Sequence, residues 1–118
     1  MVKKKPAAAD PSAWMPLSTP LFHILVSLAD DDRHGYAIML DVGERTGGAV
    51  KLWPASLYGA LQRLVRGGLV SPVTVRGETD PRRRHYRITP FGRDVLAAEG
   101  ARLEELARMA KGAAAARR

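Results

Sequence analysis

Prolines that start helices and paired glycines that end them divide this chain into short segments, and they constrain its fold more than any other feature. Thr19-Pro20 and Thr89-Pro90 each place a capping threonine before a proline, and Pro54 also suits a helix's first turn. Gly47-Gly48 and Gly67-Gly68 mark helix ends. These start and stop signals predict helices over 19–29, 34–46, 54–66 and 90–110.

The segment between the last two helices predicts a β-hairpin. Val70 to Arg76 and His85 to Thr89 are rich in strand-forming residues, and residues 77–81 between them are dense in turn formers. Ala49 to Leu52 is too short for a helix, so we expect a further small strand there. The expected fold class is therefore mainly α with a small β-hairpin.

Positive charge is concentrated in one part of the chain. The 118 residues suit one domain and carry 19 Lys and Arg against 12 Asp and Glu, for a net charge of +7. Residues 51–87 hold eight of the basic residues and only Glu78 and Asp80 as acids. Such clustering is expected of a surface that faces phosphates, although a charge run alone fits a solvated surface equally well.

Several classes of protein are excluded by what the sequence lacks. The absence of cysteine excludes a disulfide scaffold, a thiolate nucleophile and a cysteine-based metal site. His23, His34 and His85 lack helical metal-site spacing, and no carboxylate is placed for a triad, so we expect no enzyme, metal or cofactor. No apolar run approaches the ~18 residues of a membrane helix, and none follows Lys3–Lys5 as in a signal peptide. We therefore expect a cytoplasmic protein without a membrane partner.

The helix over 54–66 has one apolar and one polar side when it is projected at about 100° per residue. The polar side suits a DNA major groove, because small residues allow close approach while amide and guanidinium groups can reach base edges. A helix whose polar side is merely hydrated remains the alternative. The candidate DNA-contacting residues are Ala55, Ser56, Tyr58, Gly59, Gln62, Arg63 and Arg66.

The hairpin provides a second candidate contact with DNA. Alternation along the strand places Arg83 on the opposite face from Arg82 and Arg84, and we expect Arg76 near them across the ladder. Such a hairpin can lie along a phosphate backbone or insert an arginine into a minor groove. The candidate residues of this hairpin are Arg76, Arg82, Arg83, Arg84 and His85.

Four blocks of the sequence, in order, resemble the PadR family of bacterial transcriptional regulators. The succession of three helices and a basic hairpin is that of a winged helix-turn-helix, and the resemblance covers about residues 17–106. The blocks are His34-Gly35-Tyr36-Ala37-Ile38, Glu44-Arg45-Thr46-Gly47-Gly48, the run from Pro54 to Leu64 with Gly68-Leu69-Val70, and the run from Arg82 to Gly92.

This resemblance implies a homodimeric repressor that binds double-stranded DNA and is released by a small-molecule effector. The helix over 54–66 would be the recognition helix, the hairpin over 70–89 the wing, and the last helix the dimer contact. A nonspecific architectural DNA binder and a protein-interaction module are the alternatives. The expected regions are a flexible tail over 1–16, a winged helix domain over 17–89, a dimerisation helix over 90–111 and a flexible tail over 112–118. The implied dimer residues are Leu96, Leu103, Leu106 and Met109.

Two further expectations concern burial. The family commonly has Ser-Pro-Gly before the recognition helix where this chain has Trp53-Pro54-Ala55, and we expect Trp53 to pack on the protein rather than on DNA. In the helix over 34–46 we expect four apolar side chains to be partly buried, namely Tyr36, Ile38, Leu40 and Val42.

Overall fold

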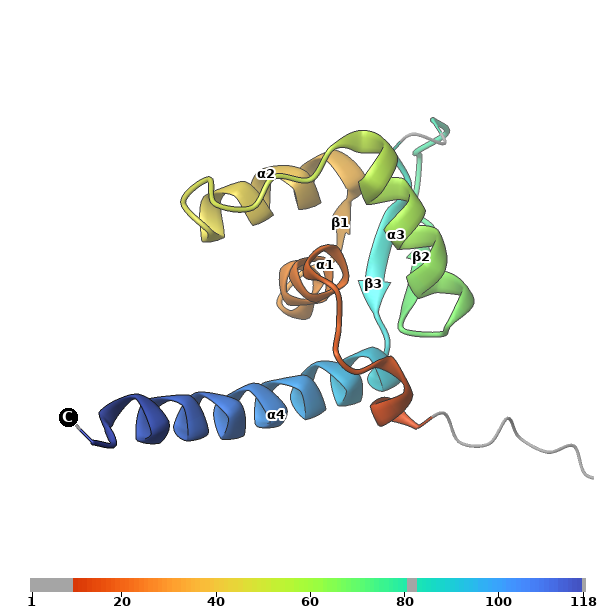
Figure 1. Ribbon diagram of the computed structural model, residues 1–118. Helices are drawn as coiled ribbons and strands as arrows, with labels where there is room; N and C mark the ends of the chain where they lie inside the picture. The colour runs from red at the N-terminus through yellow and green to blue at the C-terminus, as the bar shows by residue number, and fades with distance from the viewer. Residues whose placement is uncertain (1–9, 81–82, 118) are drawn as a thin grey trace, which may run out of the picture.

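The computed structural model describes residues 10–80 and 83–117, which contain four α-helices and a small three-stranded antiparallel sheet. This is the expected winged helix-turn-helix, in which α2 and α3 form the helix-turn-helix and β2 and β3 the wing, with α4 running away beneath them (Figure 1). The elements are η1 (Pro11–Trp14), α1 (Thr19–Ala29), β1 (Arg33–His34), α2 (Gly35–Arg45), α3 (Pro54–Arg66), β2 (Val70–Val73), β3 (His85–Ile88) and α4 (Pro90–Ala115).

The helices begin close to the positions predicted from the capping residues and prolines, but the N-cap of α1 differs from the predicted one. Ser18, not Thr19, caps α1, because its Oγ accepts a hydrogen bond from the Leu21 N–H. Thr89 caps α4 as expected: its Oγ1 accepts from the Gly92 N–H at 3.0 Å and donates to the Gly68 carbonyl at 2.6 Å. Thr89 thus joins the start of α4 to the turn that ends α3.

The third strand of the sheet is not where the sequence suggested. Residues 49–52 are not a strand, because Thr46 Oγ1 accepts the Val50 N–H at 3.0 Å and folds this segment back onto the end of α2. The sheet has the order β1-β3-β2, and its third strand is the two-residue β1, in which Arg33 pairs with Tyr86 and His34 with His85. Two residues are too few to show an alternating pattern.

The wing is shorter than predicted. Its ladder ends where Val73 pairs with His85, and the chain then turns, with the Glu78 N–H donating to the Val75 carbonyl at 3.0 Å. Gly77 adopts a φ of +83°, which favours glycine and sharpens this turn. Arg76 therefore lies in the turn, and the expectation that it faces the arginine run across the ladder is wrong.

The core lies around α1, which packs against α2, α3, β3 and α4. Side chains alternate between the two faces of β3, where Ile88 is buried and Tyr86 packs against the core while Arg87 is exposed. The buried apolar side chains are Leu17, Leu21, Ile24, Leu25, Leu28, Ile38, Val42, Leu52, Leu57, Leu61, Leu64, Leu69, Val70, Ile88 and Val95.

Burial in α2 corrects part of the sequence prediction. Ile38 and Val42 are buried as expected, but Tyr36 and Leu40 are 59% and 54% exposed. The buried face of α2 also includes Gly35, so it repeats at positions 35, 38 and 42, which leaves positions 36 and 40 on the solvent side.

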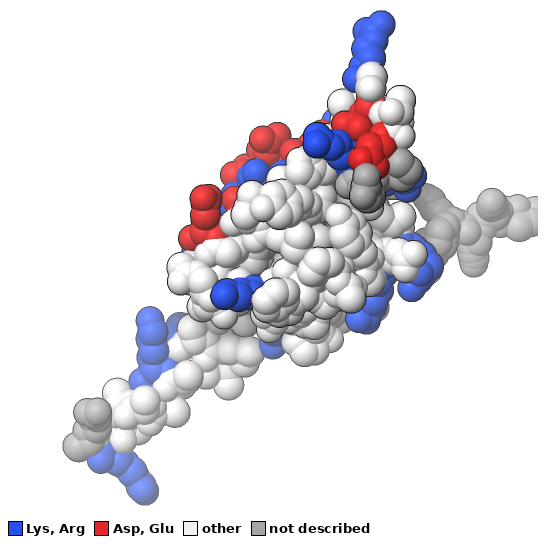
Figure 2. Space-filling model, turned by 90° about the horizontal axis from the view of Figure 1, so that it is seen from above, with Lys and Arg blue, Asp and Glu red and all other residues white. Residues whose placement is uncertain are grey.

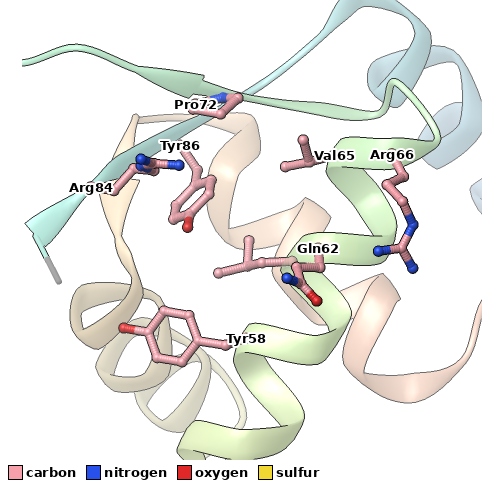
Figure 3. Close-up of a pocket in the computed structure, with 8 residues that line it drawn as sticks. Tyr58, Gln62, Val65, Arg66, Pro72, Arg84 and Tyr86 are labelled. Atoms are coloured by element: carbon pink, nitrogen blue, oxygen red, sulfur yellow. The ribbon is translucent and has the colours of Figure 1, made fainter. Parts of the chain in front are cut away.

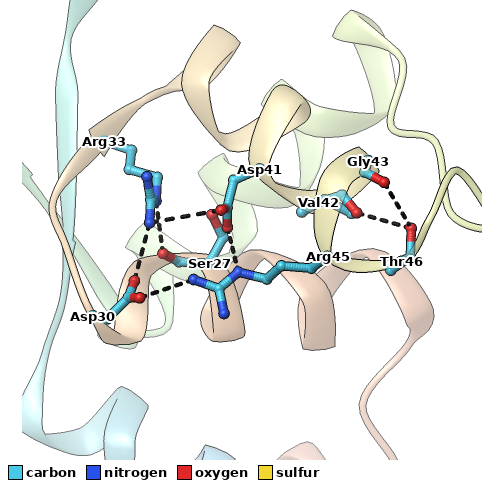
Figure 4. Close-up of polar contacts among 8 residues, drawn as sticks. All are labelled: Ser27, Asp30, Arg33, Asp41, Val42, Gly43, Arg45 and Thr46. Atoms are coloured by element: carbon cyan, nitrogen blue, oxygen red, sulfur yellow. Dashed lines mark hydrogen bonds and ion pairs between the residues drawn. The ribbon is translucent and has the colours of Figure 1, made fainter.

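A network of ion pairs fastens the end of α1 to α2 (Figure 4). Arg45 contacts Asp41 at 2.6 Å and Asp30 at 2.9 Å, while Arg33 contacts Asp30 at 3.0 Å and donates to the Ser27 carbonyl at 2.9 Å. The hydrogen bond from Arg45 is the main reason that the pKa of Asp30 lies below its usual range. These carboxylates therefore hold two helices together.

The segment before α1 is part of the fold. Residues 1–9 lie outside the described residues, but Pro11–Trp14 form η1, which packs against α4, and Trp14 and Met15 contact the core. The expected flexible tail over 1–16 is therefore wrong for residues 11–16. At the other end α4 continues to Ala115, beyond the predicted end near residue 110 and into the expected C-terminal tail.

Candidate nucleic-acid interface

The outer side of α3 is exposed as the helical projection predicted. Leu57, Leu61 and Leu64 are buried, and all seven candidate residues on the opposite side face solvent. The α3 N-cap is Trp53, whose side chain makes no capping hydrogen bond to the first turn. The N–H groups at this end therefore remain available to an anion such as a phosphate.

Two exposed aromatic side chains extend this surface beyond the predicted residues. Trp53 is 67% exposed, so the expectation that it packs on the protein is wrong, and Tyr36 stands on the solvent side of α2. The spacing of Ile38 and Val42 was a usable signal for Tyr36, because it already defined the buried side of α2. The sequence held no comparable signal for Trp53.

α3 and the wing line an open pocket of about 430 Å³ (Figure 3). In this view the side chains of Tyr86 and Arg84 project from the wing toward Tyr58, Gln62 and Arg66 on α3. Predicted residues that are far apart in sequence thus share one concave surface, which polar and apolar side chains line together. The lining residues are Tyr58, Leu61, Gln62, Val65, Arg66, Pro72, Arg84 and Tyr86.

The surroundings of the two tyrosines in this pocket affect the pKa of Tyr86 and the position of the Tyr58 ring. Partial burial raises the pKa of Tyr86 above its ordinary value, although the positive charge of Arg84 opposes the shift, so its hydroxyl is a hydrogen-bond donor at neutral pH. The Tyr58 ring lies against Gly35 at the start of α2, where a methyl group on Gly35 would come within 2.7 Å of Tyr58 Cζ. The absence of a side chain at Gly35 therefore lets the Tyr58 ring lie there.

The other wing residues occupy different positions. Arg76 and Arg83 are exposed, and Arg82 lies outside the described residues. His85 is half-buried within the sheet, where its ring stands edge-on to that of His34 with the two centroids 5.4 Å apart. His34 also caps α2 by accepting the Ala37 N–H, so it contacts both this helix and the hairpin.

Two of the arginines from the basic segment point away from the pocket. The Arg63 guanidinium lies over the Trp14 ring, 5.7 Å from its centroid, on η1. Arg87 forms a two-pronged ion pair with Asp32, with Nη2 to Oδ2 at 2.8 Å. Of the arginines that the structure describes within residues 51–87, only Arg66 and Arg84 line the pocket.

The charge on this side of the molecule is distributed unevenly. Figure 2 looks onto the face formed by α2, the start of α3 and the wing, and Lys and Arg side chains stand around the margin of a largely uncharged centre. Acidic side chains gather along one edge of this face and beside the wing tip. A bound polyanion would therefore meet positive charge at the margins and uncharged or polar groups in the middle.

The C-terminal half of α4 is a second surface with exposed apolar side chains. Residues 103–115 are all exposed, and they include Leu103, Leu106 and Met109, whereas Leu96 partly packs against the core. This part of the helix projects beyond the rest of the molecule (Figure 1).

Residues 10–80 and 83–117 contain no cluster of three or more His, Cys, Asp or Glu side chains able to hold a metal ion. Within the same ranges no helix is long and apolar enough to span a bilayer.

Comparison with known proteins gives consistent matches. The model of the transcriptional regulator PadR-like family matches residues 24–98. The transcriptional regulator Rv3488 of Mycobacterium tuberculosis is 38% identical over 87 residues, which cover 73% of this chain and 77% of that protein. A relative named "uncharacterized 37.1 kDa protein in transposon TN4556", from Streptomyces fradiae, is 42% identical over 76 residues, but the chain spans only 20% of its length.

Solved structures share the fold. A transcriptional regulator from Clostridium thermocellum has a TM-score of 0.68 and 26% identity, over 80% of this chain and 90% of that one. The structure of Bacillus subtilis PadR in complex with operator DNA has a TM-score of 0.61 and 23% identity, over 70% of this chain and 47% of that one. At this lower identity the similarity concerns the fold alone.

Proposed function

This chain belongs to the PadR-like family of transcriptional regulators, and from that premise we propose that it is a homodimeric repressor that binds a specific double-stranded DNA sequence. It acts in the cytoplasm and is released from DNA by an effector. Because the chain has no cysteine, the effector response does not use a thiol.

One observation carries the proposal of DNA binding: the outer side of α3 and the wing form a single exposed surface around one pocket. Tyr58, Gln62 and Arg66 of α3 and Arg84 and Tyr86 of the wing line it together. Small residues stand at the uncapped start of α3, where close approach to a groove is needed, and the amide of Gln62 lies further along. Gln62 reads a base edge, while Arg84 and the tyrosine hydroxyls contact phosphates.

The exposed half of α4 supports a homodimer. Residues 103–115 are all exposed in the described chain, and a helix of this length is marginal in water without packing. Leu103, Leu106 and Met109 provide the apolar side on which a second α4 packs. A two-fold dimer binds a pseudo-palindromic operator whose half-site centres lie about one DNA turn, roughly 10 base pairs, apart.

The test is selection of bound duplexes from a random DNA pool by the full chain. We expect a pseudo-palindromic sequence to emerge and to bind at least ~1,000-fold more tightly than a scrambled duplex at the same salt concentration. Binding that is equal for both duplexes identifies an architectural DNA binder instead. Failure to bind any duplex at low salt favours a protein-interaction module.

A single substitution tests the reading role of α3. Gln62→Ala should relax base preference at one position per half-site and cost about 1–3 kcal/mol on the selected duplex, with little change on the scrambled one. Ala97→Ser, at an exposed position of α4 outside the candidate DNA-contacting residues, is the control and should change neither base preference nor affinity. An equal loss for Gln62→Ala on both duplexes contradicts base reading.

A further inference from the structure

The segment before α1 is anchored to α4. The Leu17 N–H donates to the Glu99 carboxylate at 3.1 Å, and η1 packs against α4. Glu99 is 2% exposed and also holds Arg102, with Nε to Oε1 at 2.6 Å. Residues 11–17 therefore have a defined place on the same helix that carries the proposed dimer contact.

From this anchored segment the Trp14 ring reaches the end of the recognition helix. It lies against Gly67, the C-cap of α3, where a methyl group on Gly67 would come within 2.6 Å of Trp14 Cη2. Gly67 has an ordinary φ of −82°, so the turn itself does not demand glycine at this position. Glycine is required there because the Trp14 indole approaches too closely for a side chain.

The same indole ring lies under Arg63. The Arg63 Cζ is 5.7 Å from the ring centroid, within the range of a cation–π contact. Arg63 is exposed on the outer side of α3, on the flank away from the pocket that Gln62 and Arg66 line. Without the ring, a long arginine side chain at this position would sample many rotamers in water.

We propose that Trp14 is a positioning residue for DNA recognition: it holds the Arg63 guanidinium in place beside α3 for contact with a DNA phosphate. This inference rests on the proposed function. Trp14 acts on DNA only through Arg63 and is itself supported by the Glu99 anchor on α4. A cation–π contact of this kind contributes about 0.5–2 kcal/mol, which corresponds to roughly a 2- to 30-fold change in affinity.

The experiment is a double-substitution cycle on the full chain, with binding to the duplex selected by the wild type measured by fluorescence anisotropy. Trp14→Ala should weaken binding by about 3- to 10-fold, and Trp14→Phe, which keeps a ring, by less than about 2-fold. In an Arg63→Ala background the effect of Trp14→Ala should fall below about 2-fold. In an Arg66→Ala background, which removes the same charge from the same helix, the full effect should remain.

A second measurement does not depend on DNA. Trp53→Phe leaves Trp14 as the sole tryptophan of the chain, so that its fluorescence reports on its own surroundings. In that variant Arg63→Ala should change the Trp14 emission, whereas Arg66→Ala should leave it unchanged. Thermal unfolding is measured for every variant, and the binding measurements are made at a temperature at which all variants are folded.

The outcomes separate this proposal from the proposed function. Equal weakening by Trp14→Ala in all three backgrounds, or no weakening, overturns the positioning role and leaves the proposed function intact. An Arg63→Ala substitution that does not alter Trp14 emission overturns the contact itself. If the wild type selects no DNA sequence, the proposed function has failed, and the fluorescence result still decides whether Trp14 holds Arg63.

Discussion

The Glu99 carboxylate of α4 and the backbone N–H of Leu17 meet across 82 residues of sequence in a hydrogen bond of 3.1 Å. A buried carboxylate is stable only where donors satisfy it, and the Leu17 N–H and the Arg102 guanidinium supply them. This contact ties the segment before α1 to the helix that leaves the domain. It also makes Glu99 a site at which the fold should respond to pH.

Glu99→Gln should destabilise the protein at neutral pH by about 1–3 kcal/mol, because charge-assisted hydrogen bonds are lost. The hydrogen bond from Arg102 lowers the pKa of Glu99 below its ordinary 4.5, burial opposes the shift, and the Leu17 N–H assists it. A depressed pKa in the folded state contributes stability that is complete above the ordinary value and is lost as pH falls through the lower one. Urea unfolding of both proteins should therefore show a difference that shrinks below pH 4.5.

Glu105→Gln is the matched control, since Glu105 pairs with Arg108 on the exposed part of the same helix. It should change the free energy of unfolding by less than about 0.5 kcal/mol. Equal effects of the two substitutions would show that the Glu99 contact has no special role.

Gly92→Ala should destabilise the fold by about 1–3 kcal/mol, because an added methyl group would meet the Leu69 carbonyl and Ile88 Cγ1. The Leu69 carbonyl cannot easily withdraw, since it accepts the Thr89 N–H at 2.9 Å. Gly100→Ala, in the same helix but with open space around it, should instead stabilise the protein by about 0.5–1 kcal/mol. Thermal unfolding measures both, and the same sign for the two variants would refute the packing argument.

Leu103→Asp combined with Leu106→Asp should convert a homodimer into monomers, because charge on the apolar side of α4 cannot be buried against a second copy. Sedimentation velocity measures the change. Ala97→Asp with Ala101→Asp places the same charges on the other side of the helix and should leave the dimer intact. A dimer that survives the leucine substitutions would place the interface elsewhere.

Arg84→Ala should reduce the slope of log affinity against log salt concentration by about one, because one phosphate contact and its released counterions are lost. Adding Arg82→Ala should bring the reduction to about two. Arg93→Ala, which removes an exposed arginine on α4 beside the Asp30–Asp32 turn, should not alter the slope. A slope that Arg84→Ala leaves unchanged removes the wing from the interface.

The part of the candidate site that lies on α3 could be predicted from sequence, because the helical period separates buried from exposed positions. The buried and exposed sides of α3 follow from the positions of Leu57, Leu61 and Leu64 along the helix. The exposure of Tyr36 was not predicted, because its residue type suggests burial whereas the period of α2 places it on the solvent side. Arg76 was misplaced because the end of the wing ladder depends on the turn at Gly77.

The sequence by itself determined the bounds of α1, α2 and α3 to within about one residue, the start of α4, and the side of α3 that faces outward. Capping residues, glycines and the 3.6-residue period could do this because they act over a few neighbouring positions. Only the tertiary structure decided that Trp14 lies on Gly67 beneath Arg63, that Glu99 holds Leu17, and that Arg33–His34 adds a strand to the wing. These contacts join residues from about 50 to more than 80 positions apart and leave no period in the chain. They arise only when packing of the core brings the separate helices and strands together.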